Sequence, residues 1–334
     1  MSSQFPSVTI IIPVLNEERH LREVVLAARA QKYDGPLDVV ISVGPSRDRT
    51  DEIAQGLAAE FSNVTAVANP TGRTPDALNA ALAAATGDIV VRCDGHAMLP
   101  VDYVAIAVET LNRTGADNVG GVMDAQGETN FQRAVAWAMK SKFGVGSAAF
   151  HVGGVEGEAE TVYLGCFRSS ALNRVGGYDT KMTRAQDWEM NHRIRATGGL
   201  VWFNPALKVT YRPRRDLKTL SKQYLQYGQW RRRVMHMHPE TVSRASALRY
   251  FAPPVTLLAV TMGTVLGAVG LLSHNWLVWA FAAPLSYLAG IKLVSLSALK
   301  TEKFAVVMRL PFVLIAMHMN WGWGFLTSPA IRDL

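Results

Sequence analysis

Three long apolar stretches in the last third of the chain limit most strongly how it can fold. They cover residues 251–272, 276–296 and 304–326, and each comes close to the roughly 20 residues that a helix needs to cross the hydrocarbon core of a membrane. The first has no charged side chain, the second has Lys292 near one end, and the third contains Arg309 and His318. The sequence therefore predicts two membrane spans and a third segment that crosses, re-enters or lies at the interface.

The residues before these stretches have the mixed composition of a soluble protein. Basic residues crowd the approach to the first stretch, and Lys300 and Lys303 lie between the second and third. By the positive-inside rule the soluble part faces the cytoplasm, which predicts a multi-pass protein of the cell membrane. The net charge of +7 then indicates attraction to membrane lipids rather than binding of nucleic acid. The expected domains are a cytoplasmic domain, basic and aromatic interfacial helices and a membrane domain, at residues 1–210, 211–249 and 250–334.

The soluble part alternates between strand and helix patterns. Short β-branched runs that read as buried strands are followed by segments of helical spacing. The expected strands are residues 8–13, 37–43, 64–68 and 88–93, and the expected helices are residues 17–30, 50–61 and 75–85. This order predicts an α/β fold, with a mostly parallel sheet covered by helices on both faces.

Polar residues follow each of these four strands. Asn16 and Glu17 come after the first, Ser46 and Asp48 after the second, Arg73 after the third, and Asp94 and His96 after the fourth. Because the carboxyl ends of parallel strands meet at one edge of a sheet, we expect these side chains to converge on one ligand site. The chain has neither a G-x-G-x-x-G nor a P-loop motif, so neither a dinucleotide nor a P-loop site is predicted.

Asp94 and His96 end an apolar strand, within the sequence Val-Val-Arg-Cys-Asp-Gly-His. A carboxylate and an imidazole suit a divalent ion that also holds phosphate oxygens, such as Mn²⁺ or Mg²⁺. The alternative is a simple strand-to-loop turn, in which Asp94 caps the next segment and His96 is solvated. Similarly, Arg73 suits a diphosphate or is a solvated loop arginine.

Several motifs together resemble the family-2 inverting glycosyltransferases of GT-A fold. The family's Pro-x-x-Asn-Glu is matched by residues 13–17, its Asn-x-x-Gly stretch and Ala-x-Asn helix by residues 69–79, and its Asp-x-Asp by residues 94–96. The resemblance covers about residues 8–230 and is nearest to a membrane-associated branch similar to the enzymes of succinoglycan and other exopolysaccharide synthesis. It implies a GT-A domain that binds a nucleotide-diphosphate sugar and a metal.

The resemblance also implies roles for residues at the strand ends. Asp94 and His96 take the positions of the metal ligands, with His96 replacing the family's second Asp. The family's Asp-Asp-Gly-Ser-x-Asp, in which one Asp reads uracil, is replaced by residues 43–48, so uridine specificity is not implied. The residues expected to bind the nucleotide sugar are Pro13, Asn16, Glu17, Ser46, Asp48, Arg73, Asn79 and Asp94.

A carboxylate at the start of a later helix matches the family's catalytic base. Asp187 occupies this position in Arg-Ala-Gln-Asp-Trp-Glu, with Gln186 in place of the more common acid. One-step inversion needs such a group, because the acceptor hydroxyl must lose its proton as it attacks the anomeric carbon. The alternative is that Asp187 and Glu189 only cap the helix and favour its dipole.

The expected acceptor side lies later in the chain. The sequence Gln-Tyr-Gly-Gln-Trp at residues 226–230 resembles the Gln-x-x-Arg-Trp motif of polysaccharide-synthesising relatives, with Gln where Arg is usual. A helix that anchors the domain to lipid would explain these residues equally well. The residues expected to bind the acceptor are Trp188, Gln226, Gln229, Trp230 and Arg231.

The resulting hypothesis is a membrane-bound inverting glycosyltransferase that acts on a hydroxyl of a lipid-linked or cell-envelope glycan. Two alternatives remain. A polyprenyl-phosphate glycosyltransferase would use an acceptor that is already anionic, so a base such as Asp187 would be redundant. A non-catalytic component that binds nucleotide sugars within a polysaccharide assembly would explain the departures at Val43, His96 and Gln229.

Overall fold

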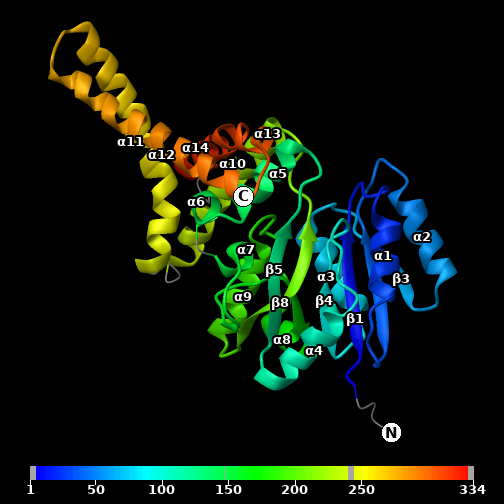
Figure 1. Cartoon of the computed structure of the whole chain (residues 1–334). Helices are drawn as coiled ribbons and strands as arrows, with labels where there is room; N and C mark the ends of the chain where they lie inside the picture. Colours follow the sequence, from blue (N-terminus) through cyan, green and yellow to red (C-terminus); the bar gives the residue numbers. More distant parts are fainter. Residues whose placement is uncertain (1–4, 147, 240–243, 330–334) are drawn as a thin grey trace. The chain divides into compact units, whose positions relative to one another are not determined.

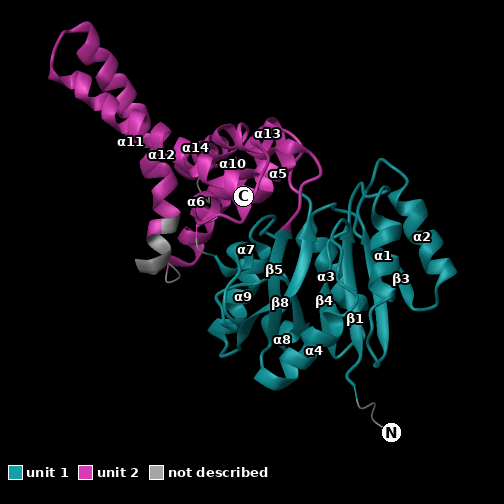
Figure 2. Ribbon diagram, viewed as in Figure 1, with its two compact units in different colours: residues 1–124, 148–212 teal, residues 125–147, 213–334 magenta. Residues whose placement is uncertain are grey.

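The computed structural model describes residues 5–146, 148–239 and 244–329. The chain divides into two compact units (Figure 2). Unit 1 contains Met1–Asp124 and Ala148–Arg212, and unit 2 contains Ala125–Ser147 and Pro213–Leu334. The segment at residues 125–147 therefore belongs with the C-terminal half of the chain, although it interrupts unit 1 in sequence.

Unit 1 is built on an eight-stranded sheet with the order β3-β2-β1-β4-β7-β5-β8-β6 (Figure 1). The strands are β1 (Val8–Val14), β2 (Leu37–Val43), β3 (Val64–Ala68), β4 (Ile89–Arg92), β5 (Asn118–Ala125), β6 (Gly157–Glu158), β7 (Tyr163–Arg168) and β8 (Val201–Tyr211). The first four strands are parallel, as predicted. The sheet then continues with antiparallel pairs, from β4 to β7 and from β7 to β5.

Helices cover both faces of this sheet, and the strand residues alternate between two hydrophobic cores. Ile10 and Ile12 of β1 belong to one core, whereas Ile11 between them belongs to the other. The first core includes residues of α1 (Leu21–Arg29), α2 (Thr50–Glu60) and α4 (Tyr103–Thr114). The second includes residues of α3 (Thr74–Ala84), α8 (Ser169–Val175) and α9 (Gln186–Ala196). The short helix α7 (Ala149–Val152) also belongs to unit 1. The period-two alternation of β1 thus has two buried faces, which explains why its sequence is apolar at every position except Thr9.

Unit 2 is helical. Its helices are α5 (Asn130–Met139), α6 (Lys142–Val145), α10 (Leu217–Met237), α11 (Arg244–Leu272), η2 (Trp276–Phe281), α12 (Ala282–Ser297), η3 (Ala298–Lys300), α13 (Phe304–Val307) and α14 (Leu310–Leu326). Side-chain N-caps are described at α5, α6, α10 and η2, with Ser141 capping α6 and Asn275 capping η2. Thr129 and Gln132 form a capping box at α5, and the Asp216 carboxylate accepts from the Thr219 amide at α10. Such caps satisfy backbone N–H groups that the helix itself leaves unpaired.

Three helical stretches of unit 2 are long and apolar enough to cross a membrane. They are Tyr250–Leu272, Trp276–Lys300 and Phe304–Leu326, which agrees with the three predicted segments. α11 and α12 form an antiparallel hairpin (Figure 1), joined by a short turn at residues 273–275 and by η2.

Candidate active site

The loops after β1 and β2 are tied together at the carboxyl edge of the parallel strands. Asn16 has a φ of 57°, a left-handed conformation that Asn tolerates better than most residues. Its amide donates to Ser46 Oγ at 3.0 Å, and its side-chain oxygen accepts from the Arg47 amide at 2.8 Å. The Glu17 amide donates to Thr50 Oγ1 at 2.7 Å. The residues after β1 and β2 that are predicted to bind the nucleotide sugar therefore lie close together.

Asp48 organises the same loops from the start of α2. Its Oδ1 accepts from the amide and the hydroxyl of Thr50, and its Oδ2 accepts from the Glu18 amide. Burial acts to raise the pKa of Asp48, but these hydrogen bonds hold that pKa below its usual range. In this structure Asp48 is thus occupied in bonds that shape the loop.

Two further residues predicted to bind the nucleotide sugar, one directly before α3 and one within it, have different surroundings. Arg73 is half exposed directly before the helix and pairs with Asp76 at 2.7 Å. Asn79 lies in the middle of the helix, where its side chain donates to the Tyr178 carbonyl and accepts from the Tyr178 amide. Asn79 therefore fastens α3 to the glycine turn at Gly176 and Gly177. Pro13, the remaining predicted residue, is half-buried within β1.

A buried arginine at the end of β4 joins two carboxylates that are 93 residues apart in sequence. The Arg92 side chain is 4% exposed. Its Nε and Nη2 donate to Asp94 Oδ1 at 3.0 and 2.9 Å, and its Nη1 donates to Asp187 Oδ1. The structure thus brings the predicted base next to the predicted metal ligand, both within unit 1.

The start of α9 places Asp187 in this cluster. Ala185, directly before the helix, has a φ of 58° and provides no side-chain cap. A left-handed alanine carries a conformational cost, and such residues concentrate at functional sites. Glu189 pairs with Arg193 at 2.5 Å. Both carboxylates lie in the first turn of α9, where they favour the helix dipole as the alternative held, and both also bind arginines.

The cluster sets the two carboxylates apart electrostatically. Burial raises the pKa of Asp187 to about 6, an effect that Arg92 opposes and that the charge of Asp94 adds to. Burial also acts to raise the pKa of Asp94, but Arg92 and His96 hold it below its usual range. Asp94 is therefore the fixed anion, and Asp187 is the carboxylate placed to exchange a proton near neutral pH.

His96 meets a carboxylate from the first strand end. Its Nδ1 lies 2.9 Å from Glu17 Oε1. A carboxylate on one ring nitrogen is the usual way in which a protein orients a histidine that binds metal through the other. The described residues contain no cluster of three or more His, Cys, Asp or Glu able to hold a metal ion. An ion at Asp94 and His96 would need phosphate oxygens and water as its remaining ligands. The metal-binding role of these two residues stays a prediction.

The predicted acceptor residues fall into both units. Trp188 is 6% exposed and stacks on His192 within unit 1. Gln226, Gln229, Trp230 and Arg231 lie on α10 of unit 2. The guanidinium of Arg233 lies over Trp230, and that of Arg231 lies over Tyr250.

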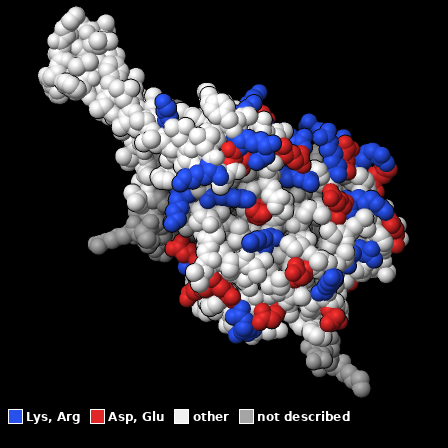
Figure 3. All heavy atoms as spheres, in the orientation of Figure 1, with Lys and Arg blue, Asp and Glu red and all other residues white. Residues whose placement is uncertain are grey.

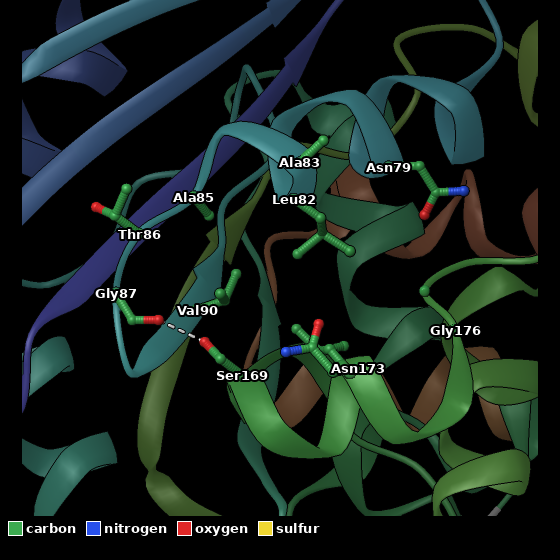
Figure 4. A pocket seen from close by; sticks show the side chains of 12 residues that line it. Asn79, Leu82, Ala83, Ala85, Thr86, Gly87, Val90, Ser169, Asn173 and Gly176 are labelled. Carbon is green, nitrogen blue, oxygen red and sulfur yellow. Dashed lines mark hydrogen bonds between the residues drawn. The ribbon is translucent and has the colours of Figure 1, made fainter.

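A separate pocket lies between α3 and α8 (Figure 4). It has a volume of about 480 Å³, and Ser169 donates a hydrogen bond across it to the Gly87 carbonyl. Gly87 and Val90 border it at the amino end of β4, whereas Arg92 is the last residue of that strand. Of the predicted site residues, only Asn79 lines it.

Sequence reasoning missed Arg92. In the sequence it is part of an otherwise apolar strand, two residues before Asp94. The signal was present, because an arginine inside a buried run has to meet carboxylates from elsewhere in the fold. The sequence offered no way to know that Asp187 is one of them.

Comparisons with known proteins show the family of this chain. The family model for glycosyl transferase family 2 matches residues 9–174. The chain is 32% identical over 324 residues to the succinoglycan biosynthesis protein ExoA of Rhizobium meliloti, covering 95% of this chain and 93% of that protein. It is 28% identical over 123 residues to glycosyltransferase AglE of Haloferax volcanii, covering 36% and 40% of the two chains.

A solved structure has the same fold. It is the mannosyltransferase PcManGT of Pyrobaculum calidifontis in complex with GDP-Man and Mn²⁺. The TM-score is 0.61 at 21% identity, and the match covers 98% of this chain and 89% of that one. This likeness confirms the predicted GT-A fold.

Proposed function

Because this chain belongs to glycosyl transferase family 2, we propose that it is an inverting transferase bound to the cell membrane. It moves a sugar from a nucleotide-sugar donor to a hydroxyl of a lipid-linked or cell-envelope glycan on the cytoplasmic face. The likeness to ExoA, a protein named for succinoglycan synthesis, supports a glycan acceptor. Arg231, Lys300 and Lys303 beside the apolar helices support the cytoplasmic orientation.

The observation that carries the proposal is the contact of Asp187 with Arg92 at the metal motif. With a pKa of about 6, Asp187 is mostly ionised at neutral pH and able to accept a proton. The acceptor oxygen forms its bond to the anomeric carbon as the bond from that carbon to the diphosphate breaks. Asp187 takes the hydroxyl proton on the side opposite the leaving group.

The opposite side of the reaction is the leaving diphosphate. A divalent metal held by Asp94 and His96 would offset the negative charge that builds there. Glu17 orients His96, and the half-exposed guanidinium of Arg73 suits a phosphate oxygen. Trp188, within unit 1, is proposed to contact the acceptor. For the α10 residues Gln226, Gln229, Trp230 and Arg231, acceptor binding stays a prediction from the sequence.

The donor site is tested by binding to the detergent-purified full chain. Calorimetry against UDP, GDP, TDP, CDP and ADP and their common sugars, with and without Mn²⁺ or Mg²⁺, should find one nucleotide that binds only with metal. Asp94→Ala and His96→Ala should abolish that binding. Asp102→Ala, which removes an exposed carboxylate without a side-chain cap bond, should not. If no nucleotide binds, the transferase proposal loses its main support.

The base is tested with Asp187→Asn, which keeps the shape of the side chain. Loss of general-base catalysis should lower transfer by about 10²–10⁴-fold, while donor affinity stays close to that of the unchanged chain. Near-normal turnover would point instead to an acceptor that is already anionic, such as a polyprenyl phosphate. Donor binding without transfer to any glycan or membrane lipid extract would point to a non-catalytic component.

A further inference from the structure

The three apolar helices of unit 2 differ in how much of each is buried within the protein. In the most apolar part of each stretch, 17% of the residues are buried in Tyr250–Leu272 and 6% in Trp276–Lys300. In Phe304–Leu326 the buried share is 39%. On α11 and α12, Leu272 and Leu293 are 81% and 69% exposed. On α14, Leu310, Val313 and Leu314 are fully buried. The hairpin therefore offers its apolar surface to the surroundings, whereas α14 uses much of its own surface inside unit 2.

α14 is buried mainly against α10, and glycines let the two backbones approach. A Cβ at Gly228 of α10 would overlap the Trp321 carbonyl, and a Cβ at Gly324 of α14 would overlap the Leu225 carbonyl. Close approach of this kind fixes one helix against the other along its length, because no flexible side chain lies between them. The two helices therefore share one position relative to any bilayer.

Polar bonds reinforce the pair. The Arg232 guanidinium donates to the carbonyls of Phe325 and Leu326 at 3.1 and 2.7 Å, and Ser328 Oγ donates to the Gln229 carbonyl at 3.0 Å. The last turn of α14 is thus closed by a charged side chain of α10. Earlier on α14, His318 Nε2 lies 2.7 Å from the Phe143 carbonyl.

The composition of α10 limits where this pair can lie. Its sequence contains no acidic residue and five Lys and Arg residues, which are Lys218, Lys222, Arg231, Arg232 and Arg233. Charged side chains at the centre of a bilayer are costly, whereas Lys and Arg at its surface are attracted to anionic headgroups. α10 therefore belongs at the membrane surface, and α14 has to lie there with it.

The hairpin has the opposite character. Residues 250–291 contain no charged residue, and in Figure 3 the far part of the hairpin shows no Lys, Arg, Asp or Glu. Its stretches of 23 and 25 residues exceed the roughly 20 that a span requires. Trp276 and Trp279 are 77% and 78% exposed beside the turn, the position at which tryptophans favour the membrane–water interface.

We propose that the α11–α12 hairpin alone crosses the membrane, and that α10 and α14 together form a layer that lies in the anionic headgroup region. Both ends of the hairpin then emerge on one side of the bilayer, and that side holds α10, α13 and α14. The residue after α14 therefore faces the same compartment as Lys303, although the stretch Phe304–Leu326 that contains α14 is apolar and long enough to cross.

The test is thiol labelling of the full chain in right-side-out and inside-out membrane vesicles with a membrane-impermeant maleimide. Cys93 and Cys166 are buried, so the unchanged chain supplies the background. Ser273→Cys reports the turn of the hairpin, Lys303→Cys the segment between α12 and α13, and Pro329→Cys the end of α14. All three positions are exposed. Labelling after detergent solubilisation checks that each introduced thiol can react. If the thiol of Pro329→Cys does not react in detergent, Thr327→Cys is used in its place.

The expected result is that positions 303 and 329 label from one side and position 273 from the other. Positions 273 and 329 on one side, opposite position 303, would mean three spans and overturn the proposal. All three positions on one side would mean that the hairpin does not cross, and would also overturn it. The labelling needs neither donor nor acceptor, so its outcome is independent of the proposed transferase activity.

Discussion

One buried guanidinium sets the electrostatics of the candidate active site. Arg92 contacts both Asp94 and Asp187, so a single positive charge is shared between a predicted metal ligand and the predicted base. Without Arg92, the two negative charges would repel each other in a buried site, and one of the carboxylates would bind a proton more readily. Arg92 is therefore what keeps Asp187 ionised close to neutral pH.

The pKa of Asp187 predicts an acid limit to transfer. Because a base has to be deprotonated and the pKa lies near 6, kcat/KM should fall about tenfold for each pH unit below that value. A pH–rate profile of transfer from pH 5 to 8 checks this, with donor affinity measured at every pH as the control. A flat profile across this range would remove Asp187 as the base.

Replacing Arg92 should change both stability and this profile. Arg92→Met leaves two carboxylates without their shared cation, and breaking a buried pair costs about 3–5 kcal/mol. The pKa of Asp187 should rise, so the acid limb should move to higher pH. Arg92→Lys keeps the charge but cannot bridge both carboxylates as a guanidinium does. Its stability and its acid limb should therefore lie between those of the unchanged chain and those of Arg92→Met.

Thermal unfolding and the pH profile together check this prediction. Arg22→Met is the matched control, because Arg22 forms an ion pair with Glu60 in which both side chains are largely exposed, and such pairs contribute little. A loss of stability at Arg92 without a shift of the acid limb would contradict the role assigned to the guanidinium.

At this scale the sequence identified the chemistry but not the contacts. Asp94, His96 and Asp187 stand out because their residue types and motif positions suit metal binding and proton transfer. The contacts of Arg92 with Asp187 and of His96 with Glu17 link residues 95 and 79 positions apart. Contacts over such separations depend on where the strands and helices pack, which motif spacing does not contain.

Among the elements, α10 and α14 depend on each other most closely. Glycine normally weakens a helix, by about 1 kcal/mol relative to alanine. At Gly228 that cost is offset by backbone contact with α14, which any side chain at this position would prevent. Elsewhere in unit 2, a Cβ at Gly290 of α12 would meet nothing within 4 Å.

These two glycines give a matched pair of substitutions. Gly228→Ala should destabilise the chain by about 1–3 kcal/mol, because the helices have to separate. Gly290→Ala should be neutral or slightly stabilising, because only the helix propensity changes. Thermal unfolding of the detergent-purified chain compares them, and equal effects would contradict the close packing of α10 on α14.

At the scale of the whole molecule, the second unit is assembled from two separate parts of the chain. Residues 125–147 belong with residues 213–334, although the sequence alone suggested a continuous domain over residues 1–210. α5 buries Ala134, Val135 and Ala138, and its Gln132 side chain donates to the Pro213 carbonyl at 3.1 Å. Helix α5 therefore depends on the C-terminal half of the chain.

Truncation after Arg212 should consequently leave an apolar face of α5 uncovered. We expect this shortened chain to aggregate, because exposed apolar patches promote association. Size-exclusion chromatography after expression checks this outcome. The control replaces only residues 258–293 of the hairpin by a short Gly-Ser linker, which keeps α5, α10 and α14 and should stay dispersed in mild detergent. A soluble, monodisperse chain of residues 1–212 would contradict the dependence.

The sequence by itself determined the parallel strands of unit 1, the apolar helices and the residue types of the candidate site. These features follow from local periodicity and from motifs a few residues long. Only the tertiary structure decided that the sheet continues with antiparallel strands, that Arg92 joins Asp94 to Asp187, and that α14 packs on the basic helix α10. The physical reason is that an apolar segment is more stable out of water, whether lipid or protein covers it, so its sequence does not determine which of the two does. A buried charge likewise requires a partner, and only the fold determines which residue that partner is.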